Sequence, residues 1–428
     1  MAKSLCLAVC TISILTMMLP AAAWADDWPN WRGPQRNGIS QEAGWNPLRL
    51  NDGPDIVWRK QIGIGFSSMA VSGDRVYAMG NTKKGGDPND QSQTDVLWCL
   101  DAKKGGELWR HAYDSPLQPK NYEGGPNATP TVEAGRVYTL SKHGHVLCLN
   151  AETGAVLWQT HLAKDHGIDP PNWGFAGSPT IIEDLVVLNA GSYGLALRKR
   201  DGRLAWKSEK GPAGYASPVP YEWKGKPCAA ILGHRELYGV DAASGRVLWK
   251  NPWTTLHDEN ITDPIVSGNK LFISTGLGTG STLFEIGDTG LKELWSRKGF
   301  ENWLGTSVLW QGHIYGIDSK RGAMECLDLD TGDVRWSQGG LGVGSLMMAG
   351  GRLIALSDKG RLVIAEAMPE KYVRLAWTQI LDGKCWTVPV LTDGCIYARN
   401  AAGDLVCIDV SAGYSELPRV RRFPSRTR

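Results

Sequence analysis

The stretch that decides the fold is Cys148-Leu-Asn-Ala-Glu-Thr-Gly-Ala-Val-Leu-Trp158. Residues 148–150 form a short apolar run, residues 151–154 are turn-forming types, and Gly154 suits the positive φ that a tight turn needs. A second β-prone run then ends on Trp158. The pattern predicts two strands joined by a tight turn.

The same hairpin returns along the whole chain. Its terminal tryptophan occurs eight times, at intervals of 41 to 51 residues, and a glycine stands four residues before five of these tryptophans. The eight are Trp58, Trp109, Trp158, Trp206, Trp249, Trp295, Trp336 and Trp377. A regular period in the forties is typical of repeat architectures such as propellers.

Each repeat also has an earlier half that predicts two more strands. It begins with small residues, often followed by proline, as in Ala128-Thr-Pro130 and Gly177-Ser-Pro179. A tight turn then leads into a strong strand, as in Gly135-Arg-Val-Tyr138. We name the four strands of a repeat A to D. Eight such antiparallel units predict an all-β fold, an eight-bladed β-propeller.

The two incomplete repeats explain how the ring is expected to close. The last repeat supplies strands A to C and ends at Cys407-Ile-Asp409, and Asp55-Ile-Val-Trp58 supplies a strand D alone. Pairing them removes the exposed edges of both. A seven-bladed ring would require that residues 364–377 form no blade.

The segments outside the repeats divide the chain into four parts. Residues 1–25 have a basic start, an apolar run and an Ala-Trp-Ala cleavage site, which predicts a secretory signal removed after Ala25. Residues 26–54 are expected to form an irregular arm, residues 55–413 the propeller, and residues 414–428 a basic, disordered tail. No later segment is apolar enough for a transmembrane helix, so the protein is expected to be periplasmic or secreted.

Charge and cysteines exclude some classes of function. The net charge of +2 gives no indication of a nucleic-acid partner. Seven cysteines follow the signal, an odd number, and four of them occupy one position in four repeats: Cys99, Cys148, Cys326 and Cys407. This predicts small buried side chains rather than a disulfide framework. A disulfide between Cys395 and Cys407, within one sheet, stays open.

The tryptophan-ended unit resembles the tryptophan-docking repeat of the quinoprotein-like, pyrroloquinoline-quinone (PQQ)-type propellers, over residues 55–410. The segment Trp28-Pro-Asn-Trp-Arg-Gly-Pro34 resembles the lead-in of exported members. One branch contains PQQ-dependent alcohol dehydrogenases. A second contains non-enzymatic propellers, including the BamB-like subunit of the outer-membrane assembly machinery, and the chain is more similar to this branch. The resemblance implies that the eight repeat tryptophans dock each blade to its neighbour.

Strand parity predicts the functional face. The A–B and C–D turns are short and share one face, whereas the B–C and D–A loops share the other and include the long excursions. We call the latter the long-loop face, and long ordered loops often carry function. Residues rimming the axial funnel there are the candidate ligand or partner site: Phe66, Glu123, Asn127, Asn172, Trp173, Asn260, Glu301, Asn302, Trp303, Lys384 and Trp386. The rim tryptophans are expected either to bind a ligand or partner or to plug the channel.

A PQQ dehydrogenase would need Ca²⁺, which takes six or more oxygen ligands. Five residues could supply some of them: Glu123, Asn172, Asn260, Asp263 and Glu301. The family enzymes, however, carry an adjacent Cys-Cys pair beside the cofactor, and this chain has neither that dipeptide nor a haem-attachment C-x-x-C-H. We therefore expect neither PQQ nor Ca²⁺, no catalytic residues and no metal site.

The function predicted from sequence is an exported, monomeric, non-catalytic propeller that binds or scaffolds a protein or cell-envelope partner on the long-loop face. Leu7-Ala-Val-Cys10 precedes most of the apolar run of the signal, so it does not indicate a lipoprotein. Two alternatives stay open: a PQQ- and Ca²⁺-dependent dehydrogenase of alcohols or sugars, and a glycan-binding propeller.

Overall fold

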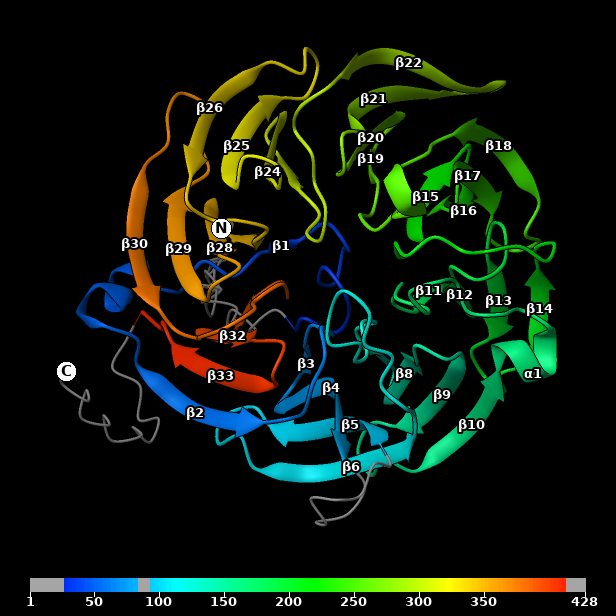
Figure 1. Ribbon diagram of the computed structural model, residues 1–428, viewed down its shortest axis with the longest axis horizontal. Coiled ribbons are helices and arrows are strands. Elements are labelled where there is room, and N and C mark those ends of the chain that lie inside the picture. The colour runs from blue at the N-terminus through cyan, green and yellow to red at the C-terminus, as the bar shows by residue number, and fades with distance from the viewer. Residues whose placement is uncertain (1–26, 84–92, 413–428) are drawn as a thin grey trace, which may run out of the picture.

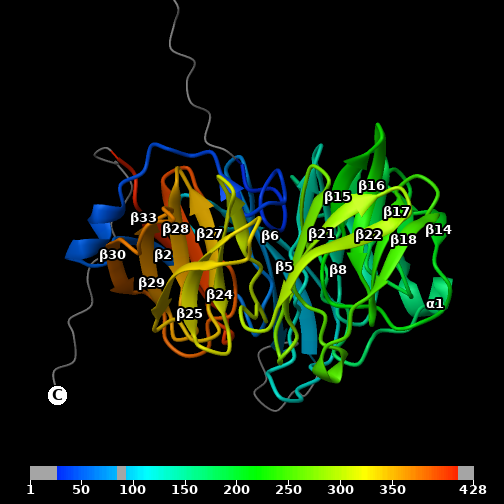
Figure 2. The same ribbon diagram turned by 90° about the horizontal axis from the view of Figure 1, so that it is seen from above.

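The protein forms a ring of eight blades around a central axis in the computed structural model, which describes residues 27–83 and 93–412 (Figure 1). The predicted signal peptide, residues 1–25, and the predicted tail, residues 414–428, lie outside the described residues. Each blade has four antiparallel strands, with strand A innermost and strand D outermost, which confirms the predicted eight-bladed propeller. Seen edge-on, the strands run between the two faces of a disc (Figure 2).

The strands are assigned to blades in chain order. Blades 1 to 3 contain β3 (Ala70–Ser72), β4 (Arg75–Lys83), β5 (Gln93–Asp101) and β6 (Glu107–Asp114); β7 (Thr131–Glu133), β8 (Arg136–Leu140), β9 (His145–Asn150) and β10 (Val156–His161); and β11 (Thr180–Ile182), β12 (Leu185–Leu188), β13 (Leu195–Arg198) and β14 (Leu204–Lys207). Blades 4 and 5 contain β15 (Val219–Trp223), β16 (Lys226–Leu232), β17 (Glu236–Asp241) and β18 (Val247–Pro252); and β19 (Ile265–Ser267), β20 (Lys270–Thr275), β21 (Gly280–Gly287) and β22 (Gly290–Arg297). Blades 6 to 8 contain β23 (Val308–Trp310), β24 (His313–Asp318), β25 (Ala323–Asp328) and β26 (Val334–Gly339); β27 (Ser345–Ala349), β28 (Arg352–Leu356), β29 (Arg361–Glu366) and β30 (Arg374–Gln379); and β31 (Val390–Thr392), β32 (Cys395–Arg399), β33 (Asp404–Asp409) and β2 (Ile56–Gln61).

Only short helices interrupt the strands. They are η1 (Pro47–Asp52), α1 (Leu162–His166) and η2 (Leu256–Asp258). Within the described ranges, none of them has the length and apolarity needed to cross a bilayer.

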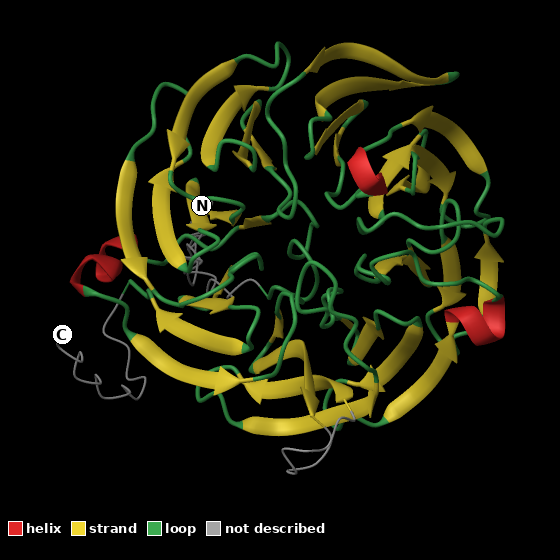
Figure 3. Ribbon diagram, in the orientation of Figure 1, coloured by secondary structure: helices red, strands yellow, loops and turns green. Residues whose placement is uncertain are grey.

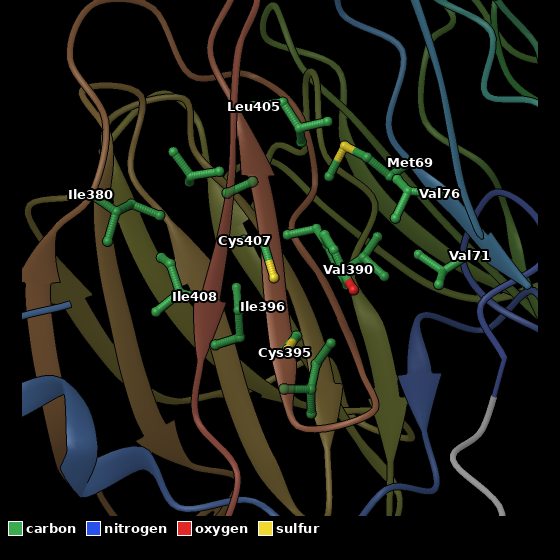
Figure 4. Packing of buried hydrophobic residues seen from close by; sticks show 14 of the residues in the cluster. Met69, Val71, Val76, Ile380, Val390, Cys395, Ile396, Leu405, Cys407 and Ile408 are labelled. Carbon is green, nitrogen blue, oxygen red and sulfur yellow. The ribbon is translucent and has the colours of Figure 1, made fainter. Parts of the chain in front are cut away.

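The ring closes as predicted, through the N-terminal strand. β2 pairs antiparallel with β33, and Trp58 lies opposite Cys407. The closure is packed by one apolar cluster in which residues of blade 8, such as Ile396 and Ile408, meet Met69 and Val76 of blade 1 (Figure 4).

All seven cysteines in the described residues are free and buried. Cys395 and Cys407 therefore form no disulfide, although both belong to the closing cluster. Their burial fits the small apolar role predicted for the repeated cysteine position.

The first part of the N-terminal arm, residues 27–40, lies in the central channel, a position that the sequence did not reveal, whereas η1 packs against the outer strand β30. Asp27 accepts hydrogen bonds at the A–B turn of blade 1, on the face opposite the long loops. The arm then reaches Ser307, before strand A of blade 6, through Arg32. It returns through β1 (Ile39–Ser40), which pairs parallel with β27, to the A–B turn of blade 8, where Glu42 accepts from the Gly394 amide. In Figure 1 the first part of the arm is the dark blue segment near the centre, and its last part is the blue helical turn at the outer edge of the ring.

The repeat tryptophans lie on outer strand D. In six of them the indole Nε1 donates to a backbone carbonyl of the following blade, at 2.7–3.1 Å: Trp58, Trp109, Trp158, Trp206, Trp295 and Trp336. Trp249 instead donates to the Tyr221 hydroxyl within its own blade. The glycine of the next blade is required at these contacts, because a Cβ on Gly154 would lie 2.6 Å from the Trp109 ring.

Trp377 departs from this arrangement by one residue. In the other blades the tryptophan lies directly after the bulge on strand D, as Trp336 does opposite Cys326. In blade 7 that position is held by Ala376, opposite Ile364. A one-residue shift turns a side chain to the other face of a strand. Trp377 consequently faces away from blade 8 and is 48% exposed.

The Gly154→Ala variant is expected to lose about 3 kcal/mol of unfolding free energy, from strain at positive φ plus overpacking against Trp109. Gly268→Ala is the matched control, because Gly268 also has a positive φ (60°) but no atom lies within 4 Å of its Cβ position. It should lose only about 1 kcal/mol. Urea denaturation of both variants measures the difference, and equal losses would contradict the packing role of the glycine.

Stability should fall as the pH is lowered through the histidine range. The rings of His145 and His161 are 4.5 Å apart, beside Tyr113 of blade 1. Burial lowers the pKa of both histidines, and the two rings' proximity lowers that of His145 further. Below the unfolded-state pKa of about 6.5 the unfolded chain therefore binds more protons, and stability present above that pH is lost. The slope of the unfolding free energy against pH should be smaller in the His145→Gln/His161→Gln variant than in the wild type. It should be unchanged in the control variant His257→Asn, because His257 is exposed.

Candidate functional site

A pocket of about 260 Å³ opens on the long-loop face, on the funnel axis. Its walls come from the loops that lead into strand A of seven blades, and its floor comes from the N-terminal arm. These loops reach into the middle of the ring, as the green segments of Figure 3 show. Because the blade is repeated around the ring, the loops that lead into strand A of these seven blades converge on the same point.

Aromatic rings form a continuous arc around this pocket. Trp303 and Trp386 have ring centroids 6.2 Å apart, and Trp386 lies 5.5 Å from Phe66. Phe66 contacts Tyr122 edge-on at 5.4 Å, and Tyr122 lies 6.0 Å from Trp173. We call these five residues the aromatic arc. Tilted and edge-on pairs at these separations are the favourable geometries for aromatic side chains, so the rings support one another.

The floor is Trp31, held by a buried carboxylate. Trp31 Nε1 donates to Asp263 Oδ2 at 2.6 Å, and the Ser217 amide donates to Asp263 Oδ1 at 2.7 Å. Burial raises the pKa of Asp263, and the neighbouring Arg32 guanidinium opposes this rise. Because Trp31 belongs to the arm, the arm both fills the channel and sets the depth of the pocket.

Lysines stack on the aromatic arc. The Lys384 ammonium lies 4.4 Å from the centre of the Trp386 ring and pairs with Glu123 at 2.9 Å. The Lys120 ammonium lies 5.1 Å from the centre of the Trp173 ring. Cation–π contacts of this kind stabilise ring positions at partly exposed sites.

Lys142 fixes Tyr122 in the same way, from a buried position. Its ammonium lies 4.6 Å from the ring centre and donates to the Tyr122 hydroxyl at 2.7 Å and to the Gly124 carbonyl at 3.2 Å. Burial lowers the pKa of Lys142 to about 8. The amide of Asn127 also donates to the Tyr122 hydroxyl. Tyr122 is therefore anchored at both its ring and its hydroxyl.

The structure brings five of the predicted rim residues to the pocket: Phe66, Asn127, Trp173, Trp303 and Trp386. Lys384 and Glu123 form the ion pair that supports Trp386, and Asn172 accepts a hydrogen bond from Lys120. These three support the wall and do not line the pocket.

The remaining three predicted residues hold loops together. The Asn260 amide is fully buried and donates to three backbone carbonyls, including that of Trp253. Glu301 accepts from the Gly278 amide at 2.8 Å, and Asn302 donates to the Ile317 carbonyl. None of the three lines the pocket, because each side chain is hydrogen-bonded to the backbone of a neighbouring loop or strand.

Among the lining residues that sequence reasoning missed are three aromatic residues and one carboxylate: Trp31, Tyr122, Tyr215 and Glu259. Trp31 lies outside the repeats, so repeat parity could not place it. Tyr122 adjoins the predicted Glu123, and Glu259 adjoins Asn260. Their positions in the loops were therefore anticipated to within one residue, but the direction of each side chain was not.

The oxygen-bearing residues do not fit a Ca²⁺ site. Asp263 is occupied by Trp31 and Ser217, while Asn260 and Glu301 are hydrogen-bonded to the backbone of neighbouring loops. Within residues 27–83 and 93–412, no three His, Cys, Asp or Glu residues are grouped to hold a metal ion. The pocket is instead lined by seven aromatic side chains together with small polar and apolar residues and the carboxylates of Glu259 and Asp263.

Comparison with known proteins gives relatives of several functions. Tetrathionate hydrolase of Acidithiobacillus ferrooxidans is 23% identical over 48% of this chain and 36% of its own length, so this chain spans about a third of that protein. Outer membrane protein assembly factor BamB of Yersinia pestis is 24% identical over 84% of this chain and 87% of its own length.

Two solved structures share the fold. BamB from Moraxella catarrhalis has a TM-score of 0.58 at 14% identity, covering 82% of this chain and 100% of that one. Quinohemoprotein alcohol dehydrogenase from Comamonas testosteroni has a TM-score of 0.64 at 12% identity, covering 94% of this chain and 82% of that one.

A comparison of the sequence with protein-family models identifies the family of this chain. The model described as outer membrane protein assembly factor BamB matches residues 92–338, which is more than half of the chain. The resemblance inferred from the tryptophan-ended repeats is thereby confirmed, and the chain belongs to the family of outer membrane protein assembly factor BamB.

Proposed function

We propose that the protein is an exported, non-catalytic propeller that binds a protein partner of the cell envelope and scaffolds outer-membrane protein assembly. The family supports the process, since its description names that role. We propose further that the protein is a monomer and that it is periplasmic or secreted. Its partner would bind the long-loop face, and no nucleic acid would take part. Neither PQQ nor Ca²⁺ is needed for this function.

The single observation that carries the proposal is the aromatic arc around a recess floored by Trp31. Clustered aromatic residues in a recess are typical of binding hot spots. A volume of about 260 Å³ is just below the ~300–1,000 Å³ of pockets for drug-sized ligands, so the recess has room for one large side chain. We infer that the partner inserts an apolar or aromatic side chain there.

One polar group of the wall supports a peptide partner. The Trp173 Nε1–H is buried and has no hydrogen-bond acceptor among the described residues. A buried donor without an acceptor costs free energy, and a backbone carbonyl of a bound segment would relieve that cost once the indole turns its N–H toward the pocket. A partner segment would therefore gain both apolar burial and one directional hydrogen bond.

Site-specific photo-crosslinking in the native host tests the proposal. A photoreactive p-benzoylphenylalanine replaces Leu304, which lines the pocket, or Leu157, a 47% exposed residue on outer strand β10. We expect one discrete crosslinked envelope protein from position 304 and none from position 157. Equal products from both positions, or none from position 304, would reject the pocket as the binding site.

A further inference from the structure

Trp377 of blade 7, which is shifted by one residue from the position of the other repeat tryptophans, forms part of an exposed surface outside the pocket. Trp377 is 48% exposed and turns toward blade 6, because Ala376 holds the docking position. The reason lies in the arm: η1 contacts β30, and Leu50 of η1 shares a buried cluster with Ala376. A tryptophan at position 376 would compete with η1 for this space. The exposure of Trp377 therefore goes together with the packing of η1 on β30.

Two arginines flank the exposed indole. The Arg361 guanidinium carbon lies 5.8 Å from the centre of the Trp377 ring, and that of Arg374 lies 5.9 Å from it. The three side chains line a small crevice between blades 6 and 7, together with Tyr372 and Leu341. Tryptophan, arginine and tyrosine are the residues most enriched in interface hot spots.

The positive charge of this surface is not neutralised by the described residues. Arg361 donates to the Gly340 carbonyl at 3.1 Å, and neither Arg361 nor Arg374 has an ion pair in the part of the chain that the structure describes. Other exposed arginines differ: Arg203, for example, lies 3.9 Å from an Asp201 carboxylate oxygen. Because the net charge of the whole chain is only +2, the charge here is a local feature.

We propose that Trp377, Arg361 and Arg374 form a docking site for an acidic segment of a partner protein. Carboxylates of the segment would accept hydrogen bonds from the outward N–H groups of the two guanidiniums, a planar geometry that arginine matches well. An apolar side chain between the carboxylates would cover the exposed part of the indole. This site lies on the outer wall of the ring and is separate from the pocket of the proposed function.

The test uses the full-length protein and a fluorescein-labelled peptide of alternating glutamate and leucine, with binding followed by fluorescence anisotropy. We expect saturable binding that Arg361→Gln/Arg374→Gln weakens by about tenfold or more, with Trp377→Ala weakening it by about threefold or more. Arg200→Gln/Arg203→Gln is the matched control, since it removes the same charge at exposed positions of blade 3. It should change affinity by less than about twofold.

Three outcomes of the peptide assay would overturn the proposal. They are no binding of the peptide by the wild-type protein, equal losses in the two double-arginine variants, and equal binding of a glutamine–leucine peptide. Vesicles containing phosphatidylglycerol form a further arm. If they bind more tightly than the peptide and depend on the same arginines, the site recognises lipid headgroups and the proposal of a protein segment is wrong.

Discussion

Arg399→Met is expected to lower the free energy of unfolding by about 3 kcal/mol. Arg399 is fully buried on β32 and joins blade 8 to blade 1 by donating to the carbonyls of Ser67, Met79 and Gly63, at 3.3, 2.5 and 2.9 Å. Removing it leaves these buried acceptors without their donor. Part of that loss is offset, because burial of the guanidinium is itself unfavourable and lowers the pKa of Arg399 to about 9.

Urea denaturation measures the effect of Arg399→Met, and two further variants make it specific. Arg399→Lys retains a donor and should lose less, whereas Arg203→Met, at an 82% exposed side chain, should stay within about 0.5 kcal/mol of the wild type. An Arg399→Met protein as stable as the wild type would show that the seam between blades 8 and 1 does not depend on this residue.

Trp303→Ala/Trp386→Ala is expected to reduce crosslinking from position 304 to the envelope partner by about tenfold or more. The two indoles form one end of the aromatic arc, so the variant removes their surfaces and leaves Trp31 below. The folded ring should persist, because both residues lie in loops and outside the strands. Quantitative immunoblotting of the crosslinked product gives the measurement.

The matched control for the pocket variant is Trp223→Ala, which removes another partly buried tryptophan, at the end of β15. It should leave crosslinking unchanged. Circular dichroism and thermal unfolding of both variants separate a loss of binding from a loss of fold. Undiminished crosslinking in a folded Trp303→Ala/Trp386→Ala protein would contradict the role of the aromatic arc.

The fold was accessible from the sequence because every blade repeats the same local pattern. The Cys148–Trp158 hairpin appears as β9 and β10, and the same logic predicted that β2 completes blade 8. The register of the strands was harder to predict from the sequence. The interval of 41 residues placed a tryptophan at 377, but the position of the bulge between Ile364 and Ala365 set its face, and the interval does not show where the bulge falls.

The candidate site was partly accessible, for a related reason. Strand parity identifies which loops converge on the funnel, and so placed Trp173, Trp303 and Trp386 at the pocket. Parity says nothing of side-chain direction within an irregular loop, so Asn260 was expected at the rim although its amide secures the loop itself. Trp31 was unpredictable because the arm has no repeat to define its place.

We propose that this propeller binds a partner through its aromatic recess and performs no quinone chemistry. Titration of the purified protein with PQQ in the presence of Ca²⁺ tests it most directly, with quinone absorbance and alcohol-dependent dye reduction as readouts. We expect no stoichiometric binding and no dye reduction, because the oxygen ligands are occupied elsewhere and do not converge. Tight binding of one PQQ per chain with alcohol-dependent dye reduction would contradict it.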